Sequence, residues 1–444
     1  MPSSQDPVID LFQGWPSPSL LPTSLLQAAS QTLLSNPSLS TPSLLYGPDP
    51  GPSCLLEHLS QYLSKFYSTS WTSSSRLTIT GGASQSLACI LQVYSDPSYT
   101  KNVYMVSPTY FLACRIFEDN GFAGRLVAVP EDQEGIDIQR LEELLARDDL
   151  ENGWLDARAT KRPLPCQKHF KNIIYCVPTF SNPSGKTMSL GRREQLVRLA
   201  RKHDALIIAD DVYDLLHWNP ARLGAAAMPR LVDIDHTLDG GVSSPYGHVV
   251  SNGSFSKVLG PGLRTGWTES TELFALGLSK CGSTRSGGSP SQFTASIIAE
   301  SLRTGAFQQY LDHVLIPAYR QRSAMALEAV QRYLLPHGVV LVTIKDSNKA
   351  NLARQMCAAV EGGYYIYIQL PKLLDATRFA EQAARQENVI VGSGENFEVV
   401  GDEASVPIKH GVRICFTWED EHRIVEGIRR LGKVLEQAMA KTGT

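Results

Sequence analysis

Short apolar runs alternate with amphipathic stretches along most of the chain, and this alternation predicts its secondary structure. Five apolar runs predict buried strands: Val103–Val106, Arg125–Val129, Asn172–Val177, Ala205–Ala209 and His248–Val250. Apolar positions with helical spacing occur around them, at Leu55–Phe66, Ser84–Tyr94 and Gly191–His203. Short unbroken strands separated by helices are typical of a mainly parallel sheet that is covered on both faces. We therefore expect an α/β fold.

A second pattern begins after a long helical region at Gln292–Leu335. It alternates strand-like runs with helical ones, namely Gly362–Leu370, Leu373–Arg385, Val389–Val391, Val412–Phe416 and Glu419–Met439. This order predicts a smaller α+β domain. We expect residues 321–444 to form this small domain and residues 51–320 the large domain. Residues 1–50 are expected to form an N-terminal arm and part of the small domain.

Segments with many polar residues or prolines complete the picture. Residues 1–50 are rich in Pro, Ser and Leu, and only Ser24–Leu34 has the spacing of a short helix. Two polar inserts, Glu151–Lys171 and Arg230–Gly247, interrupt the large domain. We expect both inserts to be surface loops.

The composition describes a globular protein whose partners are small molecules or a second copy of the chain. A chain of 444 residues is expected to form roughly two to three domains. The net charge of −3 provides no basic surface for nucleic acid or a membrane. The first residues lack the features of a signal peptide, and no apolar run is long enough to cross a bilayer, so we expect a cytoplasmic protein.

Metal-binding patterns are absent from the sequence. The eight cysteines contain no C-x-x-C pair, and the ten histidines contain no H-E-x-x-H motif. We expect no metal site and no disulfide scaffold.

Candidate chemistry gathers first around Lys257. This lysine ends the segment Ser254-Phe-Ser-Lys257, and Arg264 lies seven positions further on among glycines. An amine can form an imine with a carbonyl cofactor, hydroxyls and an arginine can bind its phosphate, and glycines let the backbone come close. The segment therefore indicates a phosphorylated carbonyl cofactor; the alternative is a glycine-rich turn with a solvated lysine.

Further motifs follow the other predicted strands. They are Ser107-Pro-Thr-Tyr110, Asn182-Pro-Ser-Gly185 and Asp210-Asp-Val-Tyr213, and the turn Gly81-Gly-Ala-Ser84 opens a helix whose N-terminus can bind an anion. Each motif alone is common in ordinary turns. Ligands of doubly wound sheets, however, gather at the carboxyl ends of the strands, and here the motifs occur there in order.

Taken together, these motifs resemble the fold-type I pyridoxal-phosphate enzymes. They are most similar to the class I/II aminotransferases of the kynurenine/2-aminoadipate type. The resemblance extends from about Gly14 to the final helix and is carried by Gly82-Ala-Ser-Gln85, Tyr110, Asn182-Pro-Ser-Gly185, Asp210-x-x-Tyr213, Ser254-x-Ser-Lys257, Arg264 and Arg413. It implies a large domain with a mainly parallel seven-stranded sheet between helices, and pyridoxal 5'-phosphate as the cofactor.

The resemblance implies a role for each cofactor-binding residue. Lys257 would form the imine with the cofactor and move the substrate proton, and Asp210 would pair with the ring nitrogen. Asn182 and Tyr213 would bind the ring oxygen, and Tyr110 would stack on the ring. The residues implied for the phosphate are Ala83, Ser84, Ser254, Ser256 and Arg264.

Substrate and subunit contacts follow from the same resemblance. Arg413 lies in an otherwise apolar strand and would bind the substrate α-carboxylate, with Gly14 and Asn182 beside it. Tyr46 would reach the phosphate of the other subunit, which implies a homodimer with shared active sites.

Other positions carry weaker implications. In some relatives an arginine near the position of Arg285 binds a dicarboxylate substrate in the neighbouring subunit, and Ser289 would contact the partner's phosphate. Relatives often have cis peptide bonds before the residues that correspond to Pro108 and Pro183.

The reaction itself has two interpretations at this stage. The resemblance implies transfer of an amino group from an amino acid to a 2-oxo acid. A carbon–sulfur lyase that β-eliminates a cysteine conjugate begins with the same removal of the Cα proton by Lys257, so the motifs do not separate the two.

Some transcription regulators carry this fold behind a winged helix, for which about fourteen residues before Gly14 are too few. The run Tyr364, Tyr365 and Tyr367 indicates either an aromatic substrate or a packed strand.

Overall fold

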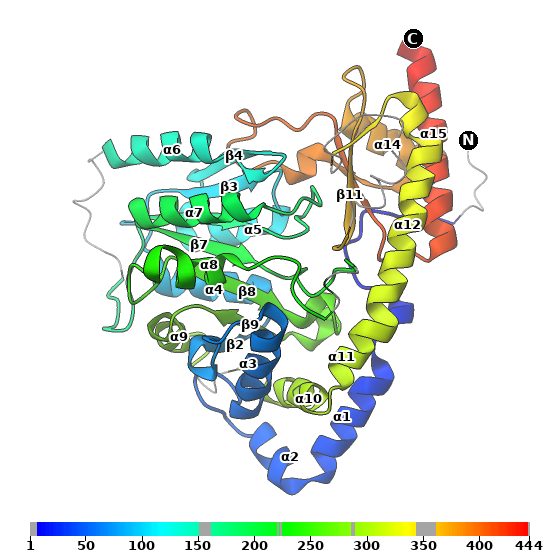
Figure 1. The fold of residues 1–444 in the computed structure, drawn as a ribbon. Coiled ribbons are helices and arrows are strands. Elements are labelled where there is room, and N and C mark those ends of the chain that lie inside the picture. The colour runs from blue at the N-terminus through cyan, green and yellow to red at the C-terminus, as the bar shows by residue number, and fades with distance from the viewer. Residues whose placement is uncertain are drawn as a thin grey trace.

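An eight-stranded sheet forms the centre of the larger part of the molecule (Figure 1). The computed structural model describes residues 7–150, 161–219, 222, 224–285, 289–342 and 361–442. The strands in spatial order are β2 (Leu77–Thr80), β9 (Gly266–Glu269), β8 (Val249–Ser254), β7 (Ala205–Asp210), β6 (Asn172–Cys176), β3 (Val103–Ser107), β4 (Leu126–Asp132) and β5 (Gly135–Ile136). Strands β8, β7, β6, β3 and β4 are parallel, whereas β9 runs antiparallel to its neighbours.

The expected α/β fold is confirmed, with one additional short strand. Seven strands form the expected sheet, and the two-residue β5 adds to it as the antiparallel partner of β4. The strands β2 and β9 have four residues each, with threonines and a glycine among them, and therefore show no apolar run in the sequence.

Helices cover both faces of the sheet (Figure 1). On one face, α6 (Ile138–Leu150), α7 (Leu190–Lys202) and α8 (Leu231–Thr237) share a core with Ile174 and Ile207. On the other face, α4 (Ala83–Tyr94), α5 (Phe111–Phe117) and α9 (Glu272–Ser279) share a core with the neighbouring positions Ile173 and Ile208. Because successive residues of a strand face opposite sides, an unbroken apolar run supplies both cores.

The expectation of a surface loop at Arg230–Gly247 was wrong for residues 230–237, whereas residues 238–246 are partly or fully exposed and contain only a short helical turn. Helix α8 occupies residues 231–237, and its residues Leu231, Val232 and Ile234 are buried against the sheet. The insert appeared polar because Asp233 and Asp235 are charged, yet both side chains are buried as well. Of the other insert, Glu151–Lys171, residues 151–160 lie outside the described residues, and residues 161–171 contain no helix or strand.

The smaller part of the molecule contains two short sheets. A four-stranded antiparallel sheet has the order β10 (Val340–Leu341), β11 (Tyr365–Gln369), β14 (Gly411–Cys415) and β13 (Gly392–Ser393). The N-terminal β1 (Ile9–Asp10) pairs in parallel with β12 (Val389–Ile390). The helices are α14 (Ala376–Glu387), α15 (Glu421–Thr442) and α12 (Ile316–Tyr333), and α12 lies along α15 (Figure 1).

The remaining helices connect these parts. They are α1 (Thr23–Ser35), α2 (Pro37–Ser43), α3 (Ser53–Tyr67), α10 (Gln292–Arg303) and α11 (Ala306–Tyr310), and α1 packs on α10.

We propose to divide the chain into domains at the expected boundaries, as residues 1–50, 51–320 and 321–444. The second boundary then falls inside α12, a continuous helix that joins the large domain to the small one. Within the described residues, no helix has both the length and the apolar character needed to cross a membrane.

Candidate active site

A cavity of about 440 Å³ lies at the carboxyl ends of β6, β7 and β8, between the sheet and the N-terminal segment. Side chains from β11 and β14 of the smaller part close it. The structure brings together there the predicted site residues Gly14, Ala83, Ser84, Tyr110, Asn182, Asp210, Tyr213, Ser254, Ser256, Lys257, Arg264 and Arg413. Tyr46 is the exception: it does not line the cavity, and 87% of its surface is exposed.

Lys257 holds its amine inside this cavity. It ends a short helical turn, Phe255–Lys257, that directly follows β8 and is capped by the hydroxyl of Ser254. The Nζ of Lys257 donates a hydrogen bond to the carbonyl oxygen of Gly14 at 2.7 Å. The pKa of this amine is lowered from 10.5 to about 8, mainly by burial; the Arg413 guanidinium acts in the same direction, while Cys415 and Asp210 oppose the shift. At pH 7 roughly a tenth of an amine with this pKa is neutral and nucleophilic, far more than for an ordinary lysine.

Asp210 ends β7 with one carboxylate oxygen free for a ligand. Its Oδ2 accepts a hydrogen bond from the hydroxyl of Tyr175 at 2.8 Å. Its Oδ1 is buried and has no hydrogen-bond partner. Burial raises the pKa of this carboxyl to about 6, although the Tyr175 bond and Lys257 lower it. A buried oxygen without a partner is costly, so the site fits a ligand that supplies a proton donor, such as a pyridinium nitrogen.

Another part of the cavity lining is suited to bind an anion. Helix α4 begins there at Ala83, so its first backbone N–H groups have no partner within the helix. The guanidinium of Arg264 is held by the carbonyls of Pro261 at 2.7 Å and Gly81 at 2.8 Å. Gly82 has a φ of +94°, and a Cβ there would lie 3.0 Å from Arg264 Nη2, so both conformation and space favour glycine. With the hydroxyls of Ser254 and Ser256, this part of the lining fits a phosphate.

Arg413 supplies the third cationic side chain of the described lining, and it is only 2% exposed. Its Nη1 donates to Asn182 Oδ1 at 2.7 Å and its Nη2 to the carbonyl oxygen of Phe12 at 2.5 Å. Its Nε is buried without a partner. The ring of Tyr365 lies 4.2 Å from the guanidinium carbon. A buried guanidinium bonded only to neutral oxygens fits a carboxylate ligand.

Sequence reasoning did not assign several residues that line the cavity. Tyr365 is one: its hydroxyl accepts a hydrogen bond from Tyr213 at 3.2 Å, and a Cβ on Gly14 would lie only 2.1 Å from it. The alternation of the tyrosine run was the available signal, because Tyr365 faces the cavity while Tyr364 donates to the carbonyl oxygen of Lys257. The other large apolar or aromatic residues in the lining had no local signal; they are Phe12, Trp15, Phe111 and Leu112.

The remaining expectations concern positions around the site. The peptide bonds Ser107–Pro108 and Asn182–Pro183 are both cis. Arg285 lies outside the cavity lining, 3.8 Å from the carboxylate of Asp49, and Ser289 donates to the carbonyl oxygen of Ser291 at 3.2 Å. In the part of the chain that the structure describes, no group of three His, Cys, Asp or Glu side chains is arranged to hold a metal ion.

The fold and this cavity define a pyridoxal-phosphate-dependent enzyme of fold type I. The chain belongs to the family of class I and II aminotransferases, whose family model matches residues 6–431. The predicted family, cofactor and transferase class are thereby confirmed.

Individual relatives agree with this assignment. The chain is 34% identical over 414 residues to the uncharacterized protein YER152C of Saccharomyces cerevisiae, covering 89% of each chain. It is 27% identical over 441 residues to aromatic-amino-acid aminotransferase 1 of Thermococcus litoralis, covering 98% of this chain and 89% of the relative. The structure is similar to that of a multiple substrate aminotransferase from Thermococcus profundus, with a TM-score of 0.77, 25% identity, and 99% and 93% of the two chains covered.

Proposed function

We propose that this enzyme transfers the amino group of an amino acid to a 2-oxo acid, with Lys257 as the residue that binds the cofactor covalently and moves the proton. One observation carries the proposal. The cavity combines a buried amine whose pKa is lowered to about 8, a buried carboxylate oxygen without a partner, and a buried guanidinium with a free N–H. This is the set of groups that amino-acid chemistry on pyridoxal phosphate requires.

The residues divide between the cofactor and the proton. Bound pyridoxal phosphate supplies a ring that withdraws electrons from the substrate Cα. Asp210 would hold a proton on the ring nitrogen through its free Oδ1, and Asn182 and Tyr213 would bind the ring oxygen. Lys257 Nζ would then accept the proton from the substrate Cα and move it to C4′ of the cofactor. The groups proposed for ring stacking and the phosphate are Tyr110, Ala83, Ser84, Ser254, Ser256 and Arg264.

Arg413 would bind the substrate α-carboxylate, because the cofactor uses the other two cations of the lining. The cationic residues among the described cavity-lining positions are Lys257, Arg264 and Arg413. This leaves none within the chain's own lining for a second carboxylate on the substrate. Gly14 and Asn182, which contact Lys257 and Arg413 respectively, would complete the carboxylate subsite.

We propose an apolar or aromatic substrate side chain, because no cationic residue of the described lining remains to bind a charged one. The lining residues that are not proposed to contact the cofactor include large aromatic and aliphatic ones, namely Phe12, Trp15, Phe111, Leu112 and Tyr365. Trp15 also contacts Trp418 edge to face, with 5.9 Å between ring centroids. Burial of apolar surface would favour bulky apolar side chains over charged ones. The name of the Thermococcus litoralis relative, aromatic-amino-acid aminotransferase 1, agrees with this class.

We further propose a homodimer in the cytoplasm. The segment between α2 and α3 exposes Leu44, Leu45 and Tyr46 to 66%, 63% and 87%, which is unusual for neighbouring large apolar residues. Contact with a second copy would cover them and bring Tyr46 to the partner's phosphate site. The described cysteines are free thiols, as expected in a reducing compartment.

A screen of amino-group donors tests the reaction. Purified enzyme is incubated with single amino acids and cysteine conjugates, each with and without a 2-oxo acid, and the products are identified; Lys257→Ala serves as the inactive control. The proposal expects a new amino acid only when the 2-oxo acid is present. Release of ammonia and pyruvate from cysteine conjugates without any 2-oxo acid, in place of transfer, would show a β-eliminating lyase instead.

A further inference from the structure

Two aspartates lie directly behind the proposed ring contacts. Asp211 and Asp214 follow Asp210 and Tyr213 in the sequence, but they do not line the cavity. They are only 5% and 4% exposed. Asp211 accepts a hydrogen bond from the hydroxyl of Ser251, and Asp214 accepts one from Tyr67 at 3.0 Å. Each keeps one buried carboxylate oxygen without a hydrogen-bond partner, which costs stability unless a nearby charge compensates it.

Burial raises the pKa of both aspartates, and part of the compensating charge comes from the fully buried Arg193 on α7. Its guanidinium hydrogen-bonds only to neutral oxygens: the carbonyls of Met188 at 3.0 Å, Pro229 at 2.8 Å and Pro178 at 2.9 Å, and the hydroxyl of Thr179 at 2.9 Å. Burial lowers the pKa of Arg193, and the carboxylates of Asp214 and Asp211 raise it again. Arg193 and the aspartate pair therefore compensate each other electrostatically.

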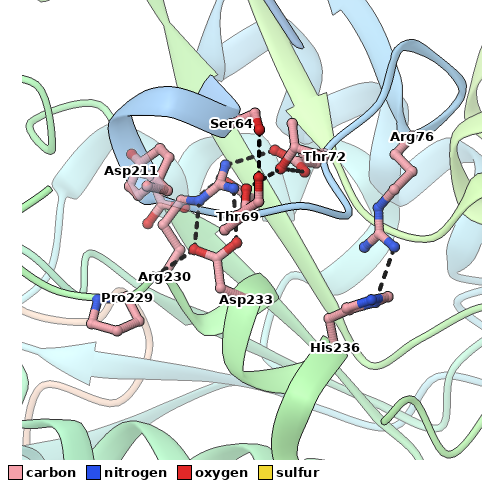
Figure 2. Close-up of polar contacts among 12 residues, drawn as sticks. Ser64, Thr69, Thr72, Arg76, Asp211, Pro229, Arg230, Asp233 and His236 are labelled. Atoms are coloured by element: carbon pink, nitrogen blue, oxygen red, sulfur yellow. Dashed lines mark hydrogen bonds and ion pairs between the residues drawn. The ribbon is translucent and has the colours of Figure 1, made fainter. Parts of the chain in front are cut away.

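A second buried arginine, Arg230, shares this role, because it too lowers the pKa of both aspartates, and its effect on Asp211 is larger than that of Arg193. Figure 2 shows Arg230 with its hydrogen bonds to Asp233, and Asp211 to one side. Its Nη1 also donates to Glu269 at 2.8 Å, so two carboxylates already neutralise it. The guanidinium of Arg230 stacks on the ring of Tyr67 at 3.8 Å, and the hydroxyl of Tyr67 donates a hydrogen bond to Asp214. Arg230 is therefore linked to the aspartate pair through Tyr67.

The contacts of this cluster reach three strand ends. Through Pro178 and Thr179, Arg193 holds the segment that leads from β6 to Asn182. Asp211 and Asp214 are part of the turn that carries Asp210 and Tyr213. The backbone N–H of Asp211 also donates to the carbonyl oxygen of Asn252 at 3.1 Å, just before Ser254 on β8.

We propose that Arg193, Asp211 and Asp214 are positioning residues that fix the cofactor-ring contacts Asn182, Asp210 and Tyr213 relative to one another. The inference rests on the proposed cofactor site. Preorganised contacts require such a supporting layer, because a small displacement of the turn would misplace both Asp210 and Tyr213 at once.

The test compares two arginines of the same helix. Arg193→Met removes the charge from the cluster. Arg201→Met is the matched control, because Arg201 also lies on α7 and is well buried, and it bonds Asp235 and the carbonyls of Leu238 and Gly241 away from the cavity. Affinity of each protein for pyridoxal phosphate is measured by titration, together with the circular dichroism of the bound cofactor in its visible band. Thermal unfolding of the proteins without cofactor reports the structural effect separately.

We expect Arg193→Met to bind pyridoxal phosphate about tenfold more weakly than wild type and to change the visible circular dichroism, with Arg201→Met close to wild type in both. An affinity of Arg193→Met less than fivefold below that of the control would overturn the inference, since both substitutions would then act only on stability. If Arg193→Met does not fold, Asp214→Asn is judged by the same fivefold criterion. Failure of the wild type itself to bind pyridoxal phosphate would refute the proposed function rather than this inference.

Discussion

Replacing Lys257 with methionine should stabilise the protein at neutral pH in the absence of cofactor, although it removes the residue proposed for catalysis. The fold lowers the pKa of this amine from 10.5 to about 8, mainly by burial. Between about pH 8 and pH 10.5, the unfolded chain binds the proton of this amine more strongly than the folded protein does. The wild type therefore gains stability as the pH rises through this range. Methionine has no proton to lose, and a variant with it lacks this dependence.

The size of the effect follows from two opposing contributions. A difference of 10.5 against about 8 corresponds to about 3 kcal/mol at pH 7, at roughly 1.4 kcal/mol per pKa unit. Methionine also loses the hydrogen bond from Nζ to the Gly14 carbonyl oxygen, which is worth about 1 kcal/mol. We therefore expect Lys257→Met to be about 2 kcal/mol more stable than wild type at pH 7, and about 1 kcal/mol less stable above pH 10.5.

Urea unfolding of the cofactor-free proteins at a series of pH values measures this difference. Lys202, whose side chain is 61% exposed, is substituted in the same way as the control for the loss of a lysine outside the cavity. A Lys257→Met protein that is no more stable than wild type at pH 7, or a difference that does not fall as the pH rises, would contradict the argument from burial.

Three further predictions concern the site. Arg413→Lys keeps the charge but loses the planar fork, so we expect KM for amino donors to rise about 30-fold with a smaller change in kcat, and an unchanged KM in steady-state assays would place the substrate carboxylate elsewhere. Asp210→Asn should lower kcat at least about 100-fold while the protein still binds pyridoxal phosphate, because an amide cannot keep the ring nitrogen protonated; full activity would exclude this partner. Tyr46→Ser should weaken binding of pyridoxal phosphate without changing the dimer mass, and a monomeric wild type in analytical ultracentrifugation would rule out the shared site.

Much of the site could be predicted from the sequence because its residues belong to local motifs. Asp210 and Tyr213 follow one strand and Lys257 another, and the carboxyl ends of parallel strands meet at one edge of the sheet. Arg413 could be predicted from a charge in an apolar strand. Phe111 and Leu112 could not, because nothing in a short apolar sequence distinguishes a cavity wall from a core.

Helix α8 shows the same limit in the fold. Its charged residues Asp233 and Asp235 indicated a loop, since the sequence does not reveal that Arg230 and Arg201 neutralise them in the interior. The partners of a buried charge come from distant parts of the chain, and periodicity describes only neighbours.

The sequence by itself thus determined the alternation of strands and helices, the family, and the order of motifs around Lys257, because each of these depends on residues close together in the chain. The tertiary structure alone decided which distant groups meet. Arg413 bonds Asn182, 231 positions away, and Lys257 bonds Gly14, 243 positions away. Such contacts depend on the strand order and on how the smaller domain packs over the sheet. The cofactor-binding chemistry was therefore readable in the motifs, whereas the apolar wall of the cavity and the buried cluster behind Asp210 required the packed fold.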